Sequence, residues 1–361
     1  MRILSAFLAV LFAIAASSAF AKTELLSANP YRGAITLNAA DGSVLFESNA
    51  DAVGYPASVL KLMTLLIVVE KVESGALRLT DRINVTAEAA KMGGSQVYLK
   101  EKESFALDEM LEALMIQSAN DAALALAIHV AGSRDAFVQL MNQRAQALGM
   151  KNTHFASPHG LPPSADQTPD TTTARDLGRL GVELSKHPLV FRYTSQKERG
   201  FRDNTFQMRN HNNLLGVVEG VDGFKTGFFR AAGFSILATA QREGVRIIAV
   251  VLGSEDRKVR DQKATELLTA GFHAVPRPAT PAPSVAPSAP TSTPTAIAAT
   301  ASNLEAAILA ADEETEEAAD ETPRSGGWWK LGAGIAIGVV LAFTLTAFLN
   351  RPRDLKKNLL R

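Results

Sequence analysis

The feature that most constrains the fold is an apolar segment that contains a single lysine. Between Val59 and Val69 nearly every residue is Leu, Met, Ile or Val, and the one charged side chain is Lys61. A segment this apolar indicates a buried helix, which we place at Ser58–Glu73 with Gly75 as its stop. The Lys61 amine must therefore either reach water or serve a step that needs a poorly hydrated amine, because burial disfavours its charged form.

The overall composition excludes several classes of protein. The 361 residues can form one large domain or two ordinary ones, each with a substantial core. The 37 basic residues are balanced by 37 acidic ones, which argues against binding to nucleic acid. The absence of cysteine excludes disulfides, thiolate chemistry and a cysteine-based zinc site, and the six histidines lack ligand-like spacing. We therefore expect neither a metal nor another cofactor.

The first 21 residues have the pattern of a secretory signal. They contain one arginine, an apolar stretch and the ending Ala19-Phe20-Ala21, which predicts cleavage before Lys22. An uncleaved anchor is the alternative, although the apolar stretch is short for a bilayer span. In both cases the chain is exported.

A second apolar segment lies near the other end of the sequence. Residues 331–349 carry no charge over a bilayer-spanning length, with Trp328 and Trp329 at one edge and a basic run, 351–361, after the other. We expect a transmembrane helix at 328–350, with the basic tail in the cytoplasm and the rest of the chain outside. A buried core helix is the alternative interpretation.

The residues before this segment cannot build a core. Residues 274–327 are rich in Pro, Ala, Ser and Thr and end in an acidic run, which predicts an extended, disordered tether. The acidic run could instead bind a partner. The folded domain is therefore expected at residues 22–273, outside the cytoplasmic membrane and anchored to it by a single C-terminal pass.

Periodicity and turn residues predict strands at both ends of this domain and helices between them. The predicted strands are 34–38, 43–47, 220–229, 233–241 and 245–252, and the predicted helices are 58–73, 107–116, 120–131, 135–148, 173–187 and 257–271. This order indicates an α+β fold with one antiparallel sheet flanked by helices and a mainly helical middle part.

Three short motifs could carry chemistry, and the first is Ser58-x-x-Lys61. Residues three apart on a helix face the same way, so the hydroxyl and the amine could meet in the first turn. An amine among apolar neighbours has a lowered pKa, and in its neutral form it could take the serine proton and create a nucleophile. The same spacing also arises by chance about once in a chain of this length.

The second motif, Ser118-Ala119-Asn120, lies at the junction of two predicted helices. The Ser118 hydroxyl could pass a proton to a leaving group, and the Asn120 amide could hold a substrate backbone. Both residues are also good helix N-caps, and taken singly they fit capping better. The tripeptide Ser27-Ala28-Asn29 repeats the pattern, which shows how weak this signal is alone.

The third motif, Lys225-Thr226-Gly227, lies on a predicted strand. The first two side chains could bind a carboxylate, and the glycine would let a ligand approach the backbone. A solvent-facing lysine on an edge strand with a glycine bulge is the alternative.

The order of the three motifs resembles the set of class A β-lactamases and penicillin-binding proteins. The blocks YPASVLKLMT, MLEALMIQSANDAALALA, MNQRAQALGMKNTHFASPHGL, TTTARDLGRL and VDGFKTGFFRAAGF are similar to those of the serine D-alanyl-D-alanine carboxypeptidases, the low-molecular-weight penicillin-binding proteins. The resemblance covers roughly residues 34–268. It implies the β-lactamase/penicillin-binding transpeptidase-like fold, a peptidoglycan stem peptide as substrate and β-lactams as covalent inhibitors.

The resemblance also implies a role for each motif residue. Ser58 attacks the carbonyl between the last two D-alanines, Lys61 is its general base, and Ser118 passes the proton to the departing D-alanine. Asn120 orients Lys61 and the substrate amide. Lys225 and Thr226 bind the terminal carboxylate beside Gly227, and the N–H groups of Ser58 and Phe228 form the oxyanion hole. Arg246 matches a basic position that supports carboxylate binding.

Two departures and three rival functions remain. Phe228 and Phe229 follow the third motif where many relatives have a polar residue, and a tether and a transmembrane segment replace the second domain and amphipathic helix of many relatives. A class A β-lactamase is disfavoured because no E-x-x-L-N block lies between Ser118 and Lys225. A D,D-endopeptidase that cuts crosslinks, and a non-catalytic penicillin sensor, remain as alternatives.

Overall fold

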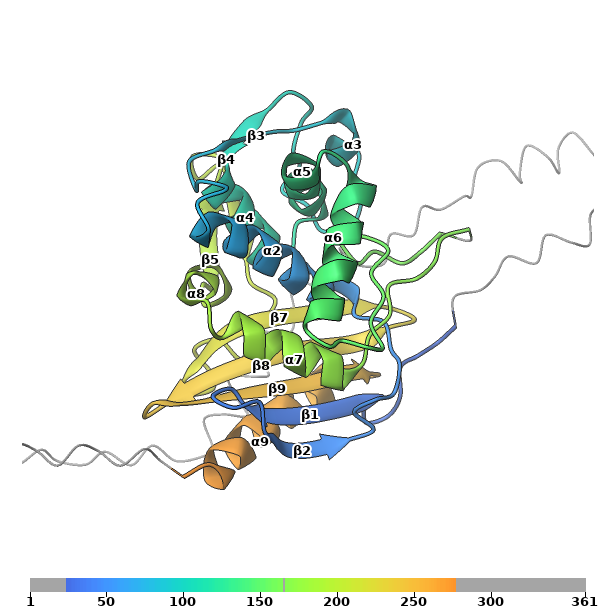
Figure 1. Cartoon of the computed structure of the whole chain (residues 1–361), viewed down its shortest axis with the longest axis vertical. Helices are drawn as coiled ribbons and strands as arrows, with labels where there is room; N and C mark the ends of the chain where they lie inside the picture. The colour runs from blue at the N-terminus through green and yellow to red at the C-terminus, as the bar shows by residue number, and fades with distance from the viewer. Residues whose placement is uncertain (1–23, 165, 277–361) are drawn as a thin grey trace, which may run out of the picture. The chain divides into compact units, whose positions relative to one another are not determined.

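The computed structural model describes residues 24–164 and 166–276. The predicted signal peptide (1–21), nearly all of the predicted tether (274–327), the predicted transmembrane helix (328–350) and the predicted basic tail (351–361) lie outside the described residues. Within the described ranges, no helix is both long enough and apolar enough to cross a bilayer. These residues form an α+β domain, as the sequence predicts (Figure 1).

An antiparallel sheet of five strands forms one half of the domain. Its strands, in spatial order, are β2 (Val44–Ser48), β1 (Gly33–Asn38), β9 (Val245–Ser254), β8 (Gly233–Arg242) and β7 (Val221–Phe229). The first and last strands of the described residues meet inside the sheet, because β1 pairs with β9 from Gly33–Leu252 to Asn38–Ile247. The strand β7 lies at one edge, and this places the third motif on an edge strand of the sheet.

Both faces of the sheet are covered by helices. The helix α9 (Arg257–Ala274) packs against β8 and β9 on one face, and α7 (Ala174–Leu184) packs against β1 and β9 on the other (Figure 1). The cover on two faces explains why β8 and β9 are buried along most of their length. Glycine lets α7 approach closely, because a Cβ on Gly181 would lie 2.8 Å from Ile248 Cγ2.

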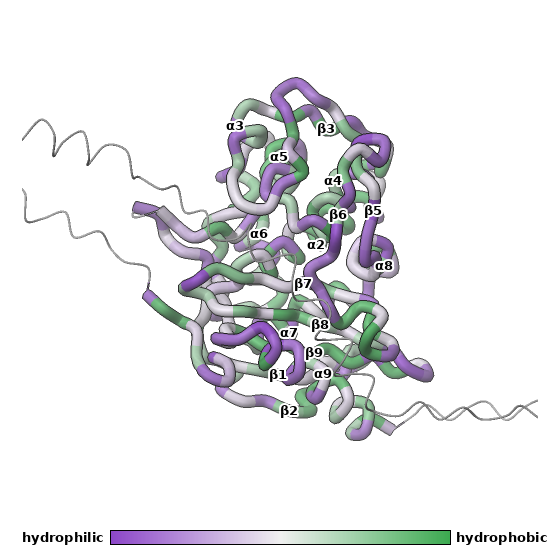
Figure 2. Tube along the Cα trace, turned by 180° about the vertical axis from the view of Figure 1, so that it is seen from behind, coloured by the Kyte–Doolittle hydropathy of each residue, from purple (hydrophilic) through white to green (hydrophobic). Residues whose placement is uncertain are grey.

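The rest of the domain is mainly helical and is built around α2. Its elements are η1 (Ala57–Leu60), α2 (Lys61–Glu73), β3 (Arg82–Asn84), α3 (Ala87–Ala90), β4 (Ser104–Ala106), α4 (Leu107–Met115), α5 (Asn120–Ala131), α6 (Arg134–Ala147), α8 (Pro188–Thr194), β5 (Glu198–Phe201) and β6 (Phe206–Arg209). From Lys61 to Val69 every residue of α2 is buried. In contrast to this buried helix, the outer loops and the β5–β6 pair carry hydrophilic residues (Figure 2).

The sequence predicted the long elements and missed the short ones. The predicted hairpin, the three late strands and the six helices are present within a few residues of their predicted bounds. The prediction of an α-helix from Ser58 was wrong in its first turn, because residues 57–60 form a 3-10 turn and the α-helix begins at Lys61. The pairs β3–β4 and β5–β6, and the helices α3 and α8, were not predicted, since segments this short lack a clear period.

Candidate active site

The buried amine of Lys61 is the centre of the candidate site. Its Nζ lies 2.9 Å from Ser58 Oγ, 2.8 Å from Asn120 Oδ1 and 2.6 Å from the carbonyl oxygen of His159. The side chain is fully buried. Burial, and then the positive charge of Lys225, hold the pKa of Lys61 well below its usual value. The amine therefore meets the serine, as the first motif predicts, rather than reaching water.

The second motif reaches the same amine from the start of α5. The N-cap of α5 is Ala119, which makes no side-chain capping bond, so Ser118 and Asn120 do not act as its caps. The Asn120 side chain instead accepts from Lys61 and donates to the carbonyl oxygen of Gly93 at 2.8 Å. Ser118 is buried and holds a left-handed backbone with φ of 60°, a costly conformation for serine. The capping interpretation is therefore wrong.

The third motif also points inward, although it lies on an edge strand. Lys225 and Thr226 are both buried, which overturns the alternative of a solvent-facing lysine. Burial, and then the charge of Arg260, lower the pKa of Lys225 to about 7. The only hydrogen bond described for the Lys225 Nζ goes to the Thr226 carbonyl oxygen at 3.1 Å. Lys225 is therefore a buried amine without a carboxylate partner within the described residues.

Gly227 brings the third motif against the first. A Cβ on this residue would lie 2.7 Å from the Pro56 carbonyl oxygen and 2.9 Å from the backbone nitrogen of Ser58. Only glycine permits this approach, and the ladder bulge lies elsewhere, between Val221 and Gly223. The next residue, Phe228, is 40% exposed and stacks on Phe234 with ring centroids 4.1 Å apart. The aromatic side chain that follows the buried third motif is therefore partly exposed to solvent.

Arg246 does not join this cluster. Its guanidinium forms a bidentate ion pair with Asp222, with both N–O distances 2.8 Å, and lies over the ring of Phe191. Arg246 pairs in register with Gln241 of β8. Along β8, Gln241 lies four residues, or about 13 Å, from the residue that pairs with Lys225. The geometry does not support the expected role of Arg246 in binding a carboxylate.

Sequence reasoning missed three groups that shape the site. Two are backbone carbonyl oxygens, of His159 and Gly93, which carry no side-chain signal. The third is Arg260, which is 2% exposed, lowers the pKa of Lys225 by its positive charge and pairs with Asp261 at 2.7 Å. It occurs in a charge-rich stretch at the start of α9, so nothing in the sequence distinguishes it from its neighbours.

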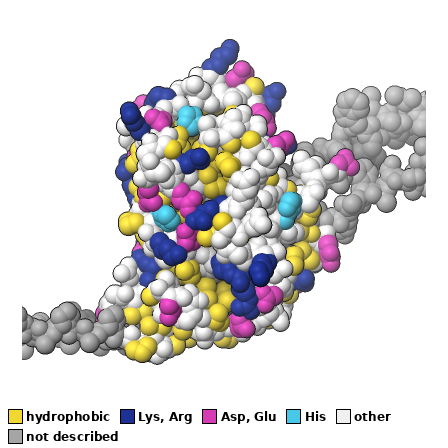
Figure 3. Space-filling view, in the orientation of Figure 1, with side chains coloured by type: hydrophobic (Ala, Val, Ile, Leu, Met, Phe, Trp, Pro, Cys, Tyr) yellow, Lys and Arg dark blue, Asp and Glu magenta, His cyan; other side chains and the backbone are white. Residues whose placement is uncertain are grey.

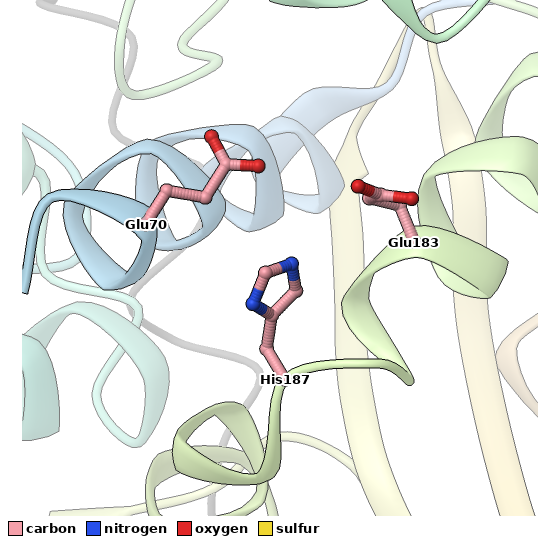
Figure 4. A group of neighbouring side chains, drawn as sticks. All are labelled: Glu70, Glu183 and His187. Carbon is pink, nitrogen blue, oxygen red and sulfur yellow. The ribbon is translucent and has the colours of Figure 1, made fainter. Parts of the chain in front are cut away.

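A second group of titratable side chains lies apart from this cluster. Glu70, Glu183 and His187 converge from α2, α7 and the start of α8 (Figure 4), with ligand atoms within 4.8 Å of one another. Arg144 already supplies a positive charge there, because its Nη2 lies 2.6 Å from one oxygen of each glutamate. We interpret this group as an ion-pair network that joins α2, α6 and α7.

The surface charges are mixed rather than grouped by sign. On the face of the described domain drawn in Figure 3, Lys and Arg side chains alternate with Asp and Glu. Arg175 on α7 illustrates the pattern, because it pairs with Asp51 and Glu47 at 2.8 Å each.

The fold and the cluster, with a buried lysine beside a serine hydroxyl, fit the class of active-site serine hydrolases. The family model described as D-alanyl-D-alanine carboxypeptidase, peptidase S11, matches residues 23–256. The chain belongs to this family, and it is a serine-type D,D-carboxypeptidase of the penicillin-binding class.

Individual relatives agree with this assignment. The chain is 35% identical to the D-alanyl-D-alanine carboxypeptidase DacF of Bacillus subtilis, over 71% of this chain and 67% of the relative. It is 38% identical to DacC of Escherichia coli, over 74% of this chain and 67% of that one. Penicillin-binding protein D2 of Listeria monocytogenes, solved with ampicillin bound, superposes with a TM-score of 0.60 at 32% identity, over 66% of this chain and 96% of that one.

A relative with a different activity bears on the alternative function. The D-alanyl-D-alanine endopeptidase of Pseudomonas aeruginosa is 32% identical over 58% of this chain and 67% of its own length. The relatives of this chain therefore include enzymes named for either reaction.

Proposed function

We propose that Ser58 is the nucleophile of a D,D-carboxypeptidase and that Lys61 is its general base. The observation that carries this proposal is the set of partners around the Lys61 Nζ. Two of them, Asn120 Oδ1 and the His159 carbonyl oxygen, can only accept hydrogen bonds. A neutral amine has two hydrogens and one lone pair, so the two acceptors take the hydrogens and the lone pair faces the Ser58 hydroxyl 2.9 Å away.

Acylation follows from this arrangement. Ser58 Oγ attacks the carbonyl between the two terminal D-alanines of a peptidoglycan stem peptide, while its proton moves to Lys61. The proton then passes through the Ser118 hydroxyl to the nitrogen of the departing D-alanine as the peptide bond breaks. Asn120, which is held by Lys61 and Gly93, orients the substrate amide. The products of this step are free D-alanine and an ester on Ser58.

The terminal carboxylate of the substrate binds at Lys225 and Thr226. A charged lysine without a carboxylate partner, next to Arg260, creates a positive potential in a buried setting where Coulomb interactions are strong. The substrate's terminal carboxylate would pair with the Lys225 amine and fix the C-terminal end of the substrate peptide. This favours substrates whose last residue carries a free carboxylate.

The backbone N–H groups of Ser58 and Phe228 form the oxyanion hole. The close approach of Gly227 to the Ser58 nitrogen supports this assignment, because it brings the two backbone segments within reach of one oxygen. Water then hydrolyses the acyl-enzyme. A β-lactam carbonyl is attacked by the same serine, and the ring-opened product remains covalently attached.

The reaction on a crosslinked dimer is the second candidate, because an endopeptidase is among the relatives. The test is to incubate the purified chain in detergent with a pentapeptide ending in D-Ala-D-Ala and with a crosslinked dimer. We expect free D-alanine from the pentapeptide and a penicillin adduct on Ser58, both lost in Ser58→Ala. Cleavage of the dimer alone would identify an endopeptidase, and binding of penicillin without turnover of either substrate would identify a sensor.

We also propose that the enzyme works outside the cytoplasm, anchored to the membrane. The support is the sequence pattern: a signal at 1–21, the catalytic domain at 22–273, a tether at 274–327, a spanning helix at 328–350 and a basic tail at 351–361. A reporter fused after Arg361 is then active only in the cytoplasm. Activity of that reporter on the outer side would refute this topology.

A further inference from the structure

A buried carboxylate in the connection between α6 and α7 belongs to none of the three motifs. Asp170 is 8% exposed, and its Oδ1 accepts from the backbone nitrogens of Ala156 at 2.6 Å and Ser157 at 3.0 Å. Its Oδ2 accepts from the Ser157 hydroxyl at 2.8 Å. Burial raises the pKa of the Asp170 carboxyl, and the three donors oppose that shift and fix the segment that supplies them.

This segment, residues 156–160, is fixed at two further points. The Ser157 Oγ accepts from the backbone nitrogen of Gly160 at 2.9 Å, which closes a tight turn. The Thr64 hydroxyl, on α2, donates to the Pro158 carbonyl oxygen at 3.2 Å. Between these two anchors lies His159, whose carbonyl oxygen accepts from the Lys61 Nζ at 2.6 Å.

The turn also touches the residue before the nucleophile. Gly160 has a φ of 78°, and a Cβ there would lie 2.2 Å from the Ala57 carbonyl oxygen. The segment 156–160 therefore packs directly against the backbone that leads into Ser58. A shift of this segment would move the base and the nucleophile relative to each other.

We propose that Asp170 is a positioning residue for the catalytic lysine. It holds the turn 156–160 so that the His159 carbonyl takes one hydrogen of the neutral Lys61 amine, which leaves the lone pair directed at Ser58. The described hydrogen bonds of Asp170 all go to residues 156 and 157, so it acts through the turn. The inference rests on the proposed function, because it presupposes that Lys61 is the base.

The charge of Asp170 has a second consequence at the same amine. The charged groups that act on Lys61 are Lys225, which lowers its pKa, and Asp121 and Asp170, which raise it. Asp121 is itself fixed by the backbone nitrogens of Leu99 and Ala122, at 3.0 and 2.9 Å. Removal of the Asp170 charge alone should therefore lower the pKa of Lys61 further.

Three variants of the full chain separate the mechanical contribution from the electrostatic one. Ser157→Ala removes the relay to Gly160 and keeps the charge. Asp170→Asn removes the charge and keeps an oxygen that accepts from Ala156 and Ser157. Asp170→Ala removes both. Asp166→Ala is the matched control, because Asp166 is an exposed carboxylate in the same connection.

The measurements are kcat, KM, the pH profile of kcat/KM, the rate of penicillin acylation and the melting temperature. We expect Asp170→Ala to lower kcat by about 100-fold and Ser157→Ala by about 10-fold, because small displacements of reacting groups have effects of this size. KM should change by less than about threefold. Asp170→Asn should recover much of kcat and move the acidic limb of the profile to lower pH, and the control should match the wild type.

Two results would overturn the inference while the wild type releases D-alanine. One is that Asp170→Ala and Ser157→Ala, although folded, keep more than about half of the wild-type kcat. The other is that the loss of activity equals the loss of folded protein and no variant changes the pH profile. A wild type that neither releases D-alanine nor binds penicillin would refute the proposed function itself, and the inference with it.

Discussion

The start of α2 and the middle of β7 each bury one lysine, and the two surroundings differ. Three oxygen atoms surround the Lys61 Nζ: Ser58 Oγ, Asn120 Oδ1 and the carbonyl oxygen of His159. The Lys225 Nζ has one described hydrogen bond, to its neighbour's carbonyl oxygen. Both amines have depressed pKa values, with burial as the main cause. The two lysines are therefore equally buried but have different hydrogen-bond partners.

The difference indicates two different roles for the same residue type. An amine whose two hydrogens are taken by fixed acceptors is held as a directed base, so its lone pair has one orientation. A buried amine that lacks a carboxylate partner is able to receive an anionic ligand, whose charge would favour the protonated form of the amine. The positive charge of Lys225 also lowers the pKa of Lys61, so the two environments are coupled. Four experiments test this comparison, the largest expected effect first.

Substitution of each lysine by arginine should affect the two positions very differently. Lys61→Arg places a group there that stays protonated, so kcat/KM should fall by at least about 1000-fold, the scale of general-base catalysis. Lys225→Arg keeps the charge, and we expect a loss of about 10-fold because the larger fork fits imperfectly. The measurement is D-alanine release, and equal losses at both positions would contradict the division of roles.

Gly227→Ala tests the contact between the two regions. The added Cβ would lie 2.7 Å from the Pro56 carbonyl oxygen, so β7 must move away from Ser58. We expect kcat to fall by about 100-fold, the size of effect that the loss of one oxyanion-hole donor produces. Gly42→Ala is the control for a methyl group added away from the site, because its Cβ would meet open space; its φ of 72° adds backbone strain that Gly227 lacks. Unchanged acylation by penicillin in Gly227→Ala would exclude a role for this contact.

Lys225→Met removes the cation and tests the coupling to Lys61. Loss of a charge-assisted bond to the substrate carboxylate should raise KM by about 10- to 100-fold. Loss of the positive neighbour raises the pKa of Lys61, so the acidic limb of kcat/KM should move to higher pH. In the wild type, KM should rise above about pH 7, where Lys225 loses its charge.

This pH dependence of KM should be absent in Lys225→Met. An acidic limb that stays in place in the variant would show that the two lysines are not coupled. A KM that rises equally in both proteins above neutral pH would assign the titration to another group.

The smallest effect concerns stability. The pKa of Lys225 is about 7 in the folded protein and 10.5 for the free side chain, so between these values the unfolded chain binds more protons. The contribution of Lys225 to the free energy of unfolding therefore increases with pH across that window. Below about pH 7 the amine is charged in both states, so the full cost of burying its charge applies. Lys225→Met should raise the melting temperature by about 3 °C or more at pH 6, the shift produced by roughly 1 kcal/mol.

The gain in Lys225→Met should shrink toward pH 10, where the wild-type amine is neutral in both states. Lys151→Met is the control, because Lys151 is exposed. A gain that does not depend on pH, or an equal gain in the control, would show that burial of the charge is not its cause.

Local sequence pattern predicted most of the architecture and half of the site. The apolar helix, the late antiparallel strands and the place of the third motif on one of them follow from hydrophobic periodicity and turn residues. The meeting of Ser58 and Lys61 follows from a spacing of three residues, although the turn that joins them is 3-10. Arg246 was assigned by resemblance alone, and its ion pair with Asp222 shows why that was insufficient.

The sequence by itself determined the residue types, their order and the apolar setting of Lys61. Only the tertiary structure decided which atoms complete that setting, because Asn120 and the His159 carbonyl lie 59 and 98 positions away along the chain. Backbone carbonyls have no residue-specific signal, and the orientation of Arg260 and Asp170 depends on packing between distant elements. A base needs a direction as well as a pKa, and that direction arises only when the chain folds.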